Sequence, residues 1–297
     1  MITCSVCATV RPDNEEQCPR CGWYRHPSWT VQEQNIHFEK HCALWNSTEE
    51  IPPRPVDPPN YPMVQIKAQS FVMGSGNDEL GRDPDEDEHT VTLTKDFLIG
   101  LTEVPQRLYA LLAFDNPSSF LGPDRPVDSI TWIEAVKFCN AFSEHHKLTP
   151  AYTFKGTSVL WDIEANGYRL PTESEWECAA RVAASGRPLQ TQAWNESNSQ
   201  YETHVVGQHV GPAESLGISD MAGNVWEWCW DFYAPYPKGP VSDPVGPKTG
   251  SSRVARGGSW VDAQRIVRPA NRGQAPQHHR SNGIGFRLAK NRTIPTD

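Results

Sequence analysis

Residues 220–231 read DMAGNVWEWCWD, and this stretch gives the strongest indication of where the core of the protein lies. Trp226, Trp228 and Trp230 alternate at period two, which predicts a β-strand whose large aromatic side chains centre a core. The Ala-Gly-Asn triplet before the strand predicts a turn. Asp220 and Glu227 flank this turn, and hard carboxylate oxygens beside bent backbone suit Ca²⁺. The pattern therefore predicts a calcium site, with two solvated acids beside a buried strand as the alternative.

Two CxxC pairs near the amino terminus predict a structural zinc site. The ligands would be Cys4, Cys7, Cys18 and Cys21, because two such knuckles complete a tetrahedral thiolate site. The site would be closed, with no open position for catalysis. A module of this size needs the metal to fold. We therefore predict a zinc ribbon over residues 1–25, which resembles adaptor modules, and nearby acidic residues favour a protein partner over nucleic acid.

A proline-rich stretch separates this module from the remainder of the chain. Residues 26–62 are interpreted as a connecting segment, because the sequence over 51–62 holds six prolines and predicts a stiff, extended linker. The main domain is then expected over 63–292, followed by a short tail at 293–297. This gives one small and one large domain.

The large domain mixes strand and helix patterns with long loops. Strands are predicted near 71–73 and 90–94, and helices over 104–114, 132–145 and 173–181. Thr131 is expected to cap the second helix, and Thr172 with Glu175 forms a capping-box pattern at the third. Three cysteines, Cys139, Cys178 and Cys229, lie in apolar patterns and are interpreted as core residues. The pattern as a whole predicts an α+β fold rich in loops.

Charge is distributed unevenly over the 297 residues. The net charge of -9 argues against a general nucleic-acid binder. Residues 78–88 carry seven acids against one arginine, whereas 253–292 carries nine Lys/Arg against one acid. Either the two blocks face each other, or the basic block meets an anionic ligand.

The sequence shows neither a membrane span nor a secretion signal. No apolar run approaches the roughly 20 residues that a span requires, and the amino terminus has no basic-then-apolar pattern. We therefore expect a cytoplasmic protein with reduced thiols and no membrane partner.

A series of motifs carries a family resemblance. FVMGS, HTVTL, RPVDSITW, GYRLPTESEW, GISDMAGNVWEW, RGGSW and NGIGFRLA follow one another in order. They resemble the formylglycine-generating enzyme, or sulfatase-modifying factor, domain family over about residues 63–290. The resemblance implies a C-type-lectin-like α+β domain. It also implies a calcium site at Asp220, Glu227 and the carbonyls of Gly223 and Val225.

The catalytic centre that the resemblance implies is absent from this sequence. Enzymes of the family hold Cu(I) with two cysteines just after the GGS motif, and thiolates suit this soft ion. Counting back from Arg272, the second cysteine position falls on Pro269 and the first near Gln264. Neither side chain can replace a copper-binding thiolate, so no catalytic residue is assigned.

The carboxy-terminal segment is the expected ligand-binding surface. In the family this segment lines the binding surface, and here its framework motifs alternate with dissimilar residues. The candidate contacts are Trp260, Val261, Asp262, Ala263, Arg265, Arg268, Arg272, Gln274, His278, His279, Ser281 and Asn282. Arginine and histidine suit a protein or peptide ligand, or an anionic small molecule.

Four functions therefore remain open at this point. The first is a non-catalytic ligand- or protein-binding member of the family with a zinc-ribbon adaptor. The second is a variable protein of a diversity-generating retroelement, which the tail resembles. The others are an oxidative formylglycine-generating or related maturation enzyme, and a structural subunit of a complex.

Overall fold

The computed structural model describes residues 60–112, 116–184, 188–189, 193–208 and 216–292, together with the backbone of two short amino-terminal strands. The amino-terminal strands are β1 (Ile2–Thr3) and β2 (Val10–Arg11), which pair in antiparallel fashion. The helices are α2 (Gln106–Leu112), α3 (Trp132–His145) and α4 (Glu173–Ala184). The remaining strands are β3 (Met63–Ile66), β4 (Gln69–Met73), β5 (His89–Leu93), β6 (Phe97–Gly100), β7 (Tyr152–Lys155), β8 (Ser158–Trp161), β9 (Tyr168–Arg169), β10 (Trp226–Phe232), β11 (Val241–Ser242), β12 (Arg253–Arg256), β13 (Arg272–Ala275), β14 (Ile284–Gly285) and β15 (Ala289–Asn291).

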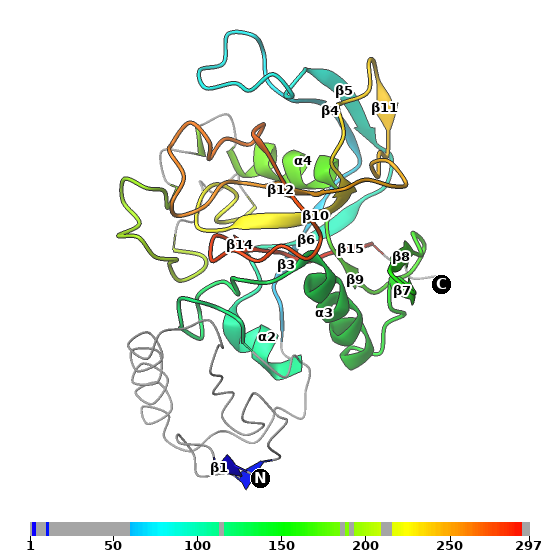
Figure 1. Cartoon of the computed structure of the whole chain (residues 1–297). Helices are drawn as coiled ribbons and strands as arrows, with labels where there is room; N and C mark the ends of the chain where they lie inside the picture. The colour runs from blue at the N-terminus through cyan, green and yellow to red at the C-terminus, as the bar shows by residue number, and fades with distance from the viewer. Residues whose placement is uncertain are drawn as a thin grey trace.

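In the described residues, small sheets and the helices α2, α3 and α4 build the large domain, which confirms the α+β prediction. One sheet has the order β13-β12-β10-β14, a second β11-β5-β4, and a third β3-β6-β15-β9. Strand β10 is antiparallel to β12 and parallel to β14. Figure 1 shows α4 and α3 on opposite sides of this central region, with the β7–β8 hairpin at one edge.

Strand β10 lies between two hydrophobic clusters, whereas its alternating sequence predicted only a strand at the centre of a core. Trp228 is fully buried in the cluster that includes α3, whereas Cys229, the next residue, lies in the cluster that includes α4. The indole N–H of Trp228 donates to the carbonyl of Ile130 over 2.9 Å. The indole of Trp132 donates in turn to the carbonyl of Cys229 over 2.8 Å. The strand expected at residues 226–230 is therefore confirmed, with Trp228 in the core and Trp226 and Trp230 only partly buried against it.

The helix starts follow local capping chemistry. Thr131 caps α3, and its side chain and that of Glu134 exchange bonds with each other's backbone N–H. At α4, the Thr172 N–H donates to Glu175, and the Glu175 N–H donates back to the Thr172 hydroxyl. Both predicted caps are thus present. Helix α2 begins directly after Pro105, later than the residue 104 expected from its apolar pattern.

The end of the proline-rich linker is already part of the folded domain. Tyr61 is buried, and its hydroxyl donates to the carbonyl of Thr102. Its ring packs against the backbone of Gly100, where an added Cβ would lie 2.0 Å from the Tyr61 hydroxyl oxygen. Only glycine fits at this position, and Tyr61, two residues before the expected boundary at Met63, already packs within the domain.

Candidate functional site

The turn expected to bind calcium lies in a buried part of the domain. Asp220, Gly223 and Asn224 have positive φ values of 58°, 74° and 60°. A Cβ at Gly223 would lie 2.0 Å from the Trp194 carbonyl oxygen, so glycine is required there. Val225 and Glu227 are fully buried. The predicted turn is present, and its two acids do not face water.

Both carboxylate oxygens of Glu227 already accept hydrogen bonds. Arg287 donates from Nε to Oε2 and from Nη2 to Oε1, each over 2.6 Å. The indole of Trp176 also donates to Oε2, over 2.7 Å. The carboxylate of Glu227 therefore compensates the buried Arg287 cation, an arrangement that the sequence did not indicate.

Asp220 instead lies beside a carboxyl group from another loop. Its Oδ2 accepts from the Gly207 N–H over 2.6 Å, and the Glu103 carboxyl is within hydrogen-bond reach. Burial raises the pKa of Asp220 to about 6, and the charge of Glu227 adds to this increase. Burial also raises the pKa of Glu103 well above its usual range, assisted by the charges of Asp220 and Glu227. Glu103 follows an apolar strand, and nothing in its local sequence indicated this pairing.

These acids do not form a conventional three-residue metal cluster. Within the part of the chain that the structure describes, no group of three or more His, Cys, Asp or Glu side chains is placed to hold a metal ion. Any cation at this turn would depend on two carboxylates and on backbone oxygens.

The expected ligand-binding residues fall into three classes of exposure. Those exposed to solvent are Val261, Arg265, Gln274, His278 and His279. Those partly exposed are Asp262, Ala263, Arg272, Ser281 and Asn282, whereas Trp260 and Arg268 are buried. The side chain of Arg272 is itself only 1% exposed. The expected contact surface is therefore smaller than the sequence suggested.

Arg268 lies inside the acidic block instead of facing solvent. Its guanidinium donates to both oxygens of Glu86 over 3.0 and 2.7 Å, and to Glu79 over 2.7 Å. It also donates to the carbonyl of Gly81 over 2.6 Å. Burial alone would raise the pKa of Glu86, but hydrogen bonds from Arg268 and Ser75 hold it below its usual value. Arg268 thus stabilises the loop and is not placed to meet a ligand.

Arg272 also forms an ion pair with a buried acid, Glu173. It donates from Nε to Oε1 and from Nη2 to Oε2 of Glu173, over 2.7 and 2.9 Å. Its guanidinium stacks on the Tyr236 ring with 3.8 Å between charge centre and ring centroid. Arg256 reaches the same Glu173 over 2.7 Å. The expectation that Arg272 meets a ligand therefore conflicts with its burial.

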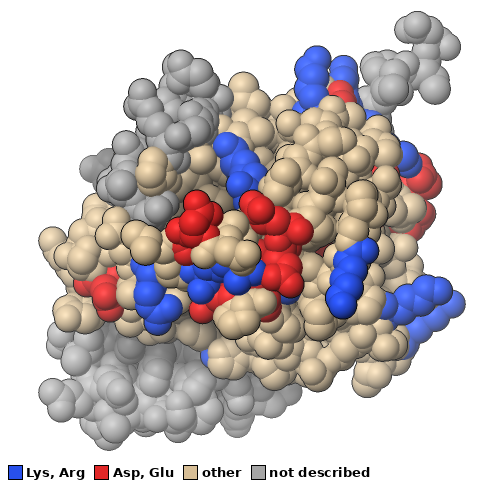
Figure 2. Space-filling view, turned by 90° about the horizontal axis from the view of Figure 1, so that it is seen from above, with Lys and Arg blue, Asp and Glu red and all other residues tan. Residues whose placement is uncertain are grey.

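The two oppositely charged blocks of the sequence face each other. Besides Arg268, Asn271 donates to Asp83 over 2.9 Å, and Arg272 lies 3.9 Å from Asp85. In Figure 2, red and blue side chains adjoin across the middle of the face viewed from above. Of the two alternatives raised by the charge pattern, mutual pairing is confirmed.

Trp260 joins three loops beneath the exposed surface. Its indole donates to the Asn282 carbonyl over 2.9 Å, and its carbonyl accepts from the Ser199 hydroxyl over 2.8 Å. The Phe120 ring meets the Trp260 ring edge-on with centroids 5.2 Å apart. The expected surface is therefore fixed to its neighbours by a buried aromatic residue.

Asp262 holds the chain just after the GGSW motif. Its Oδ2 accepts from the Ser259 N–H and hydroxyl, over 2.9 and 2.5 Å, and from the Trp226 indole over 2.8 Å. Its carbonyl accepts from the Glu196 N–H over 3.0 Å. Asp262 thereby connects the carboxy-terminal loop to β10 and to the 193–208 loop.

Tyr201 is a surface residue that sequence reasoning missed. It is 74% exposed, and its N–H donates to the Ser199 hydroxyl, the same group that bonds to Trp260. Val261, 49% exposed, directly follows Trp260. A single tyrosine in a polar loop gives no periodic signal, so nothing in the sequence singled out Tyr201.

The cysteine positions agree with a core interpretation. Cys139, Cys178 and Cys229 are buried and free, and burial raises the pKa of each thiol. At the positions expected for the copper ligands, Gln264 is exposed and the Pro269 carbonyl accepts from Arg256 over 2.5 Å. The segment from 260 to 271 contains no cysteine in its sequence.

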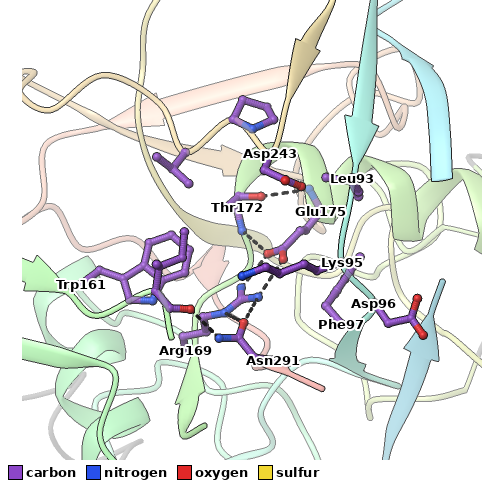
Figure 3. A pocket seen from close by; sticks show the side chains of 13 residues that line it. Leu93, Lys95, Asp96, Phe97, Trp161, Arg169, Thr172, Glu175, Asp243 and Asn291 are labelled. Atoms are coloured by element: carbon purple, nitrogen blue, oxygen red, sulfur yellow. Dashed lines mark hydrogen bonds and ion pairs between the residues drawn. The ribbon is translucent and has the colours of Figure 1, made fainter. Parts of the chain in front are cut away.

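A separate pocket lies between α4, β8 and the β5–β6 connection (Figure 3). On its floor Arg169 makes two bonds to Glu175, over 2.6 and 2.7 Å, and donates to Asn291 over 3.1 Å. Lys95 pairs with the exposed Glu164 over 2.9 Å at its rim. The floor is a self-paired polar network, and no expected ligand-binding residue lines the pocket.

The four expected zinc ligands, Cys4, Cys7, Cys18 and Cys21, lie outside the described residues, as do most of the linker and the 293–297 tail. Within the described residues, no helix is long and apolar enough to cross a membrane.

Comparisons with known proteins agree with this fold. A family model described as "Sulfatase-modifying factor enzyme 1-like domain" matches residues 47–292. Chaperone protein LppX of Paenibacillus barcinonensis is 35% identical, over 59% of this chain and 73% of the relative. Formylglycine-generating enzyme of Streptomyces coelicolor is 36% identical over 41% of this chain, and the match spans 46% of that enzyme. The structure named Treponema denticola variable protein 1 aligns with a TM-score of 0.69 and 34% identity, covering 77% of this chain and 95% of that chain. The chain therefore belongs to the sulfatase-modifying factor, or formylglycine-generating enzyme, domain family.

Proposed function

We propose that this chain is a non-catalytic recognition protein that binds a protein or peptide ligand through one exposed surface. We call this surface the recognition face and define it as Tyr201, Val261, Arg265, Gln274, His278 and His279. Its amino-terminal cysteine quartet would bind zinc and act as an adaptor.

The observation that carries the proposal is the contrast between exposed and buried members of the carboxy-terminal segment. Arg268 and Arg272 are paired internally, whereas Tyr201 and Val261 expose apolar surface on loops fixed by Trp260. A rigid loop that presents tyrosine and an aliphatic residue resembles the anchors of protein interfaces. The basic groups of the face as defined are Arg265, His278 and His279, and this small number suits a peptide better than a compact polyanion.

The thiol chemistry also supports binding over oxidation. Copper-dependent oxidation in this family would require two accessible thiolates, and the segment after Ser259 supplies none. The three described cysteines are buried, and their raised pKa values keep them as thiols at neutral pH.

A second candidate is a variable protein of a diversity-generating retroelement. The 34% identity to Treponema denticola variable protein 1 favours it. In that case the residues of the recognition face would differ among copies of the gene, while Trp260 and Asp262 would stay constant because they fix the loops.

The binding proposal can be tested with peptides selected from a random phage-displayed library on the immobilised protein. In the selected complexes we expect Tyr201→Ala with Val261→Ala to weaken binding by about 30-fold or more, as expected for anchors of about 2 kcal/mol. The matched control is Phe154→Ala with Leu160→Ala on the β7–β8 hairpin, where the side chains are 39% and 46% exposed. This control should bind like the parent.

Two results would contradict the proposal. One is equal binding by the Tyr201/Val261 double variant, which would place recognition elsewhere. The other is conversion of a cysteine-containing peptide to its aldehyde by copper-loaded protein under oxygen, which would identify an enzyme.

A further inference from the structure

Arg253, at the start of β12, is a buried arginine that forms no ion pair with any acid of the described residues. It is only 4% exposed, and burial lowers its pKa to about 10. The other buried arginines in the described part of the chain all pair with glutamates: Arg169, Arg256, Arg268 and Arg287. Because a buried charge is costly unless it is compensated, Arg253 is the exception that needs an explanation.

Aromatic rings hold the guanidinium of Arg253 in place. Its central carbon lies 3.5 Å from the ring centroid of Phe232 and 3.7 Å from a ring centroid of Trp132. Nη1 donates to the carbonyl of Trp230 over 2.6 Å, within the stretch of β10 where the register with β12 shifts. The cation is therefore fixed before any ligand arrives, which lowers the entropy cost of binding one.

One edge of this guanidinium has no acceptor. Nε is buried without a hydrogen-bond partner, and Nη2, on the same edge, donates to no described residue. Arg287 uses this same edge, Nε with Nη2, to bind both carboxylate oxygens of Glu227. Arg272 binds both oxygens of Glu173 in the same way. Two arginines of this fold thus show which group the free edge of Arg253 can accept, namely a carboxylate.

The surroundings of this edge match a small organic anion. Nη2 of Arg253 lacks a partner but is not enclosed, so the edge opens toward the surface. Trp230 and Phe232 are only partly buried, and their rings offer apolar surface beside the cation. Arg253 supplies one positive charge, which matches one carboxylate better than a polyanion.

We propose that Arg253 binds the carboxylate of an organic acid through its Nε–Nη2 edge. The carboxylate would take the position that a glutamate takes at Arg272 and Arg287, and the rings of Trp230 and Phe232 would contact the apolar part of the ligand. A free aromatic acid and an acidic side chain of a peptide both offer this group. Arg253 is not a member of the recognition face, so this site is tested independently of it.

The test follows the Arg253 Nε–H signal of the isotope-labelled full chain by NMR, assigned by through-bond experiments. The probes are benzoate, a free aromatic acid, and N-acetyl-glutamic acid amide, which carries the acid as a peptide does. We expect a saturable shift of this signal with benzoate and none with uncharged benzamide. A saturable shift with the blocked glutamic acid alone would also support the site and would identify a peptide side chain as its ligand.

Two variants examine the role of the two-donor edge, with the indole N–H signals of Trp132 and Trp230 as the readout. Arg253→Lys keeps the charge but loses the planar pair of donors, so we expect it to bind benzoate about 10-fold more weakly or worse. Arg107→Met is the matched control, because it removes an exposed cation on α2 that pairs with Asp124. This control should bind benzoate like the parent.

Two results would overturn the proposal. If neither acid shifts the Nε–H signal of the parent in a saturable manner, the guanidinium of Arg253 only stacks between the two rings. This result needs no variant, so it decides the matter even if substitution of Arg253 prevents folding. If Arg253→Lys, shown to be folded by circular dichroism, keeps the parental affinity for benzoate, the acid does not bind through the Nε–Nη2 edge.

Discussion

Arg265 and Arg268 show how differently two arginines of one loop can act. The sequence offers no distinction between them, yet Arg265 is exposed whereas the side chain of Arg268 is only 2% exposed and pairs with Glu86. Gly81 packs directly on Arg265, since an added Cβ would lie 2.9 Å from the Arg265 Cβ. The first is exposed to solvent, and the second stabilises the loop through its pairing with Glu86.

A pair of substitutions separates these two functions. We expect Arg268→Met to lower the free energy of unfolding by about 3–5 kcal/mol, because it leaves Glu86 buried without its cation. Arg265→Met should change stability by less than about 0.5 kcal/mol, as for ordinary surface positions. Urea unfolding at neutral pH measures both. Equal stabilities of the two variants would show that the acidic loop does not depend on Arg268.

At the scale of elements, α4 is a helix whose buried surface carries acids. Glu173, Glu175 and Glu177 are all buried, and each pairs with arginine. The Glu173 N–H at the first turn of α4 donates to Asp231 Oδ2 over 2.8 Å. Strand β10 and helix α4 are therefore joined by a carboxyl at the helix amino terminus.

The buried carboxyl of Asp231 makes the stability of the protein depend on pH. Burial, together with the charge of Glu173, raises the pKa of Asp231 from 3.8 to about 8. The folded protein thus keeps a proton that the unfolded chain releases, and stability falls as pH rises from about 4 to about 8. Through this group the free energy of unfolding falls by at most about 1.4 kcal/mol for each unit of pH.

Asp231→Asn should remove this slope, since asparagine can still accept from the Glu173 N–H. We expect the variant to be more stable than the parent at pH 8–9, as measured by thermal unfolding across a pH series. Asp162→Asn, at an exposed position, serves as the control. A parent-like pH profile in Asp231→Asn would assign the dependence to another buried acid.

At the scale of the whole molecule, the large domain is held by buried ion pairs that connect distant segments. Arg287–Glu227, Arg268–Glu86 and Arg256–Glu177 each join side chains that are no more than 2% exposed. Removing one partner of such a pair is costly, so the framework tolerates change at the recognition face better than at these positions.

A second prediction for the whole molecule concerns the amino-terminal cysteines. We expect one zinc ion per full chain, bound by the four cysteines at 4, 7, 18 and 21, and measured by metal analysis of purified protein. Changing all four to serine should abolish zinc content and leave the thermal unfolding of the large domain unchanged, because its described core uses other residues. Retention of zinc by that variant, or disulfides at these residues in the parent, would contradict the prediction of a zinc ribbon.

Much of the local structure could be read from the sequence, because it depends on residues only a few positions apart. The alternation of Trp226, Trp228 and Trp230 predicted β10, and the threonine caps predicted the starts of α3 and α4. The motif series indicated the family, which the family model confirms. The sequence alone also established that no cysteine follows Ser259 at the copper positions.

Only the tertiary structure showed which charged residues are exposed to solvent and which are buried in ion pairs. Arg268 and Glu86 are 182 positions apart, and Asn224 and Glu103 are 121 apart, so no local pattern could pair them. The same holds for Tyr201, whose exposed position beside Ser199 no periodicity indicated. Periodicity and capping arise from interactions within a few residues, whereas burial and charge compensation depend on which distant segments the fold brings together.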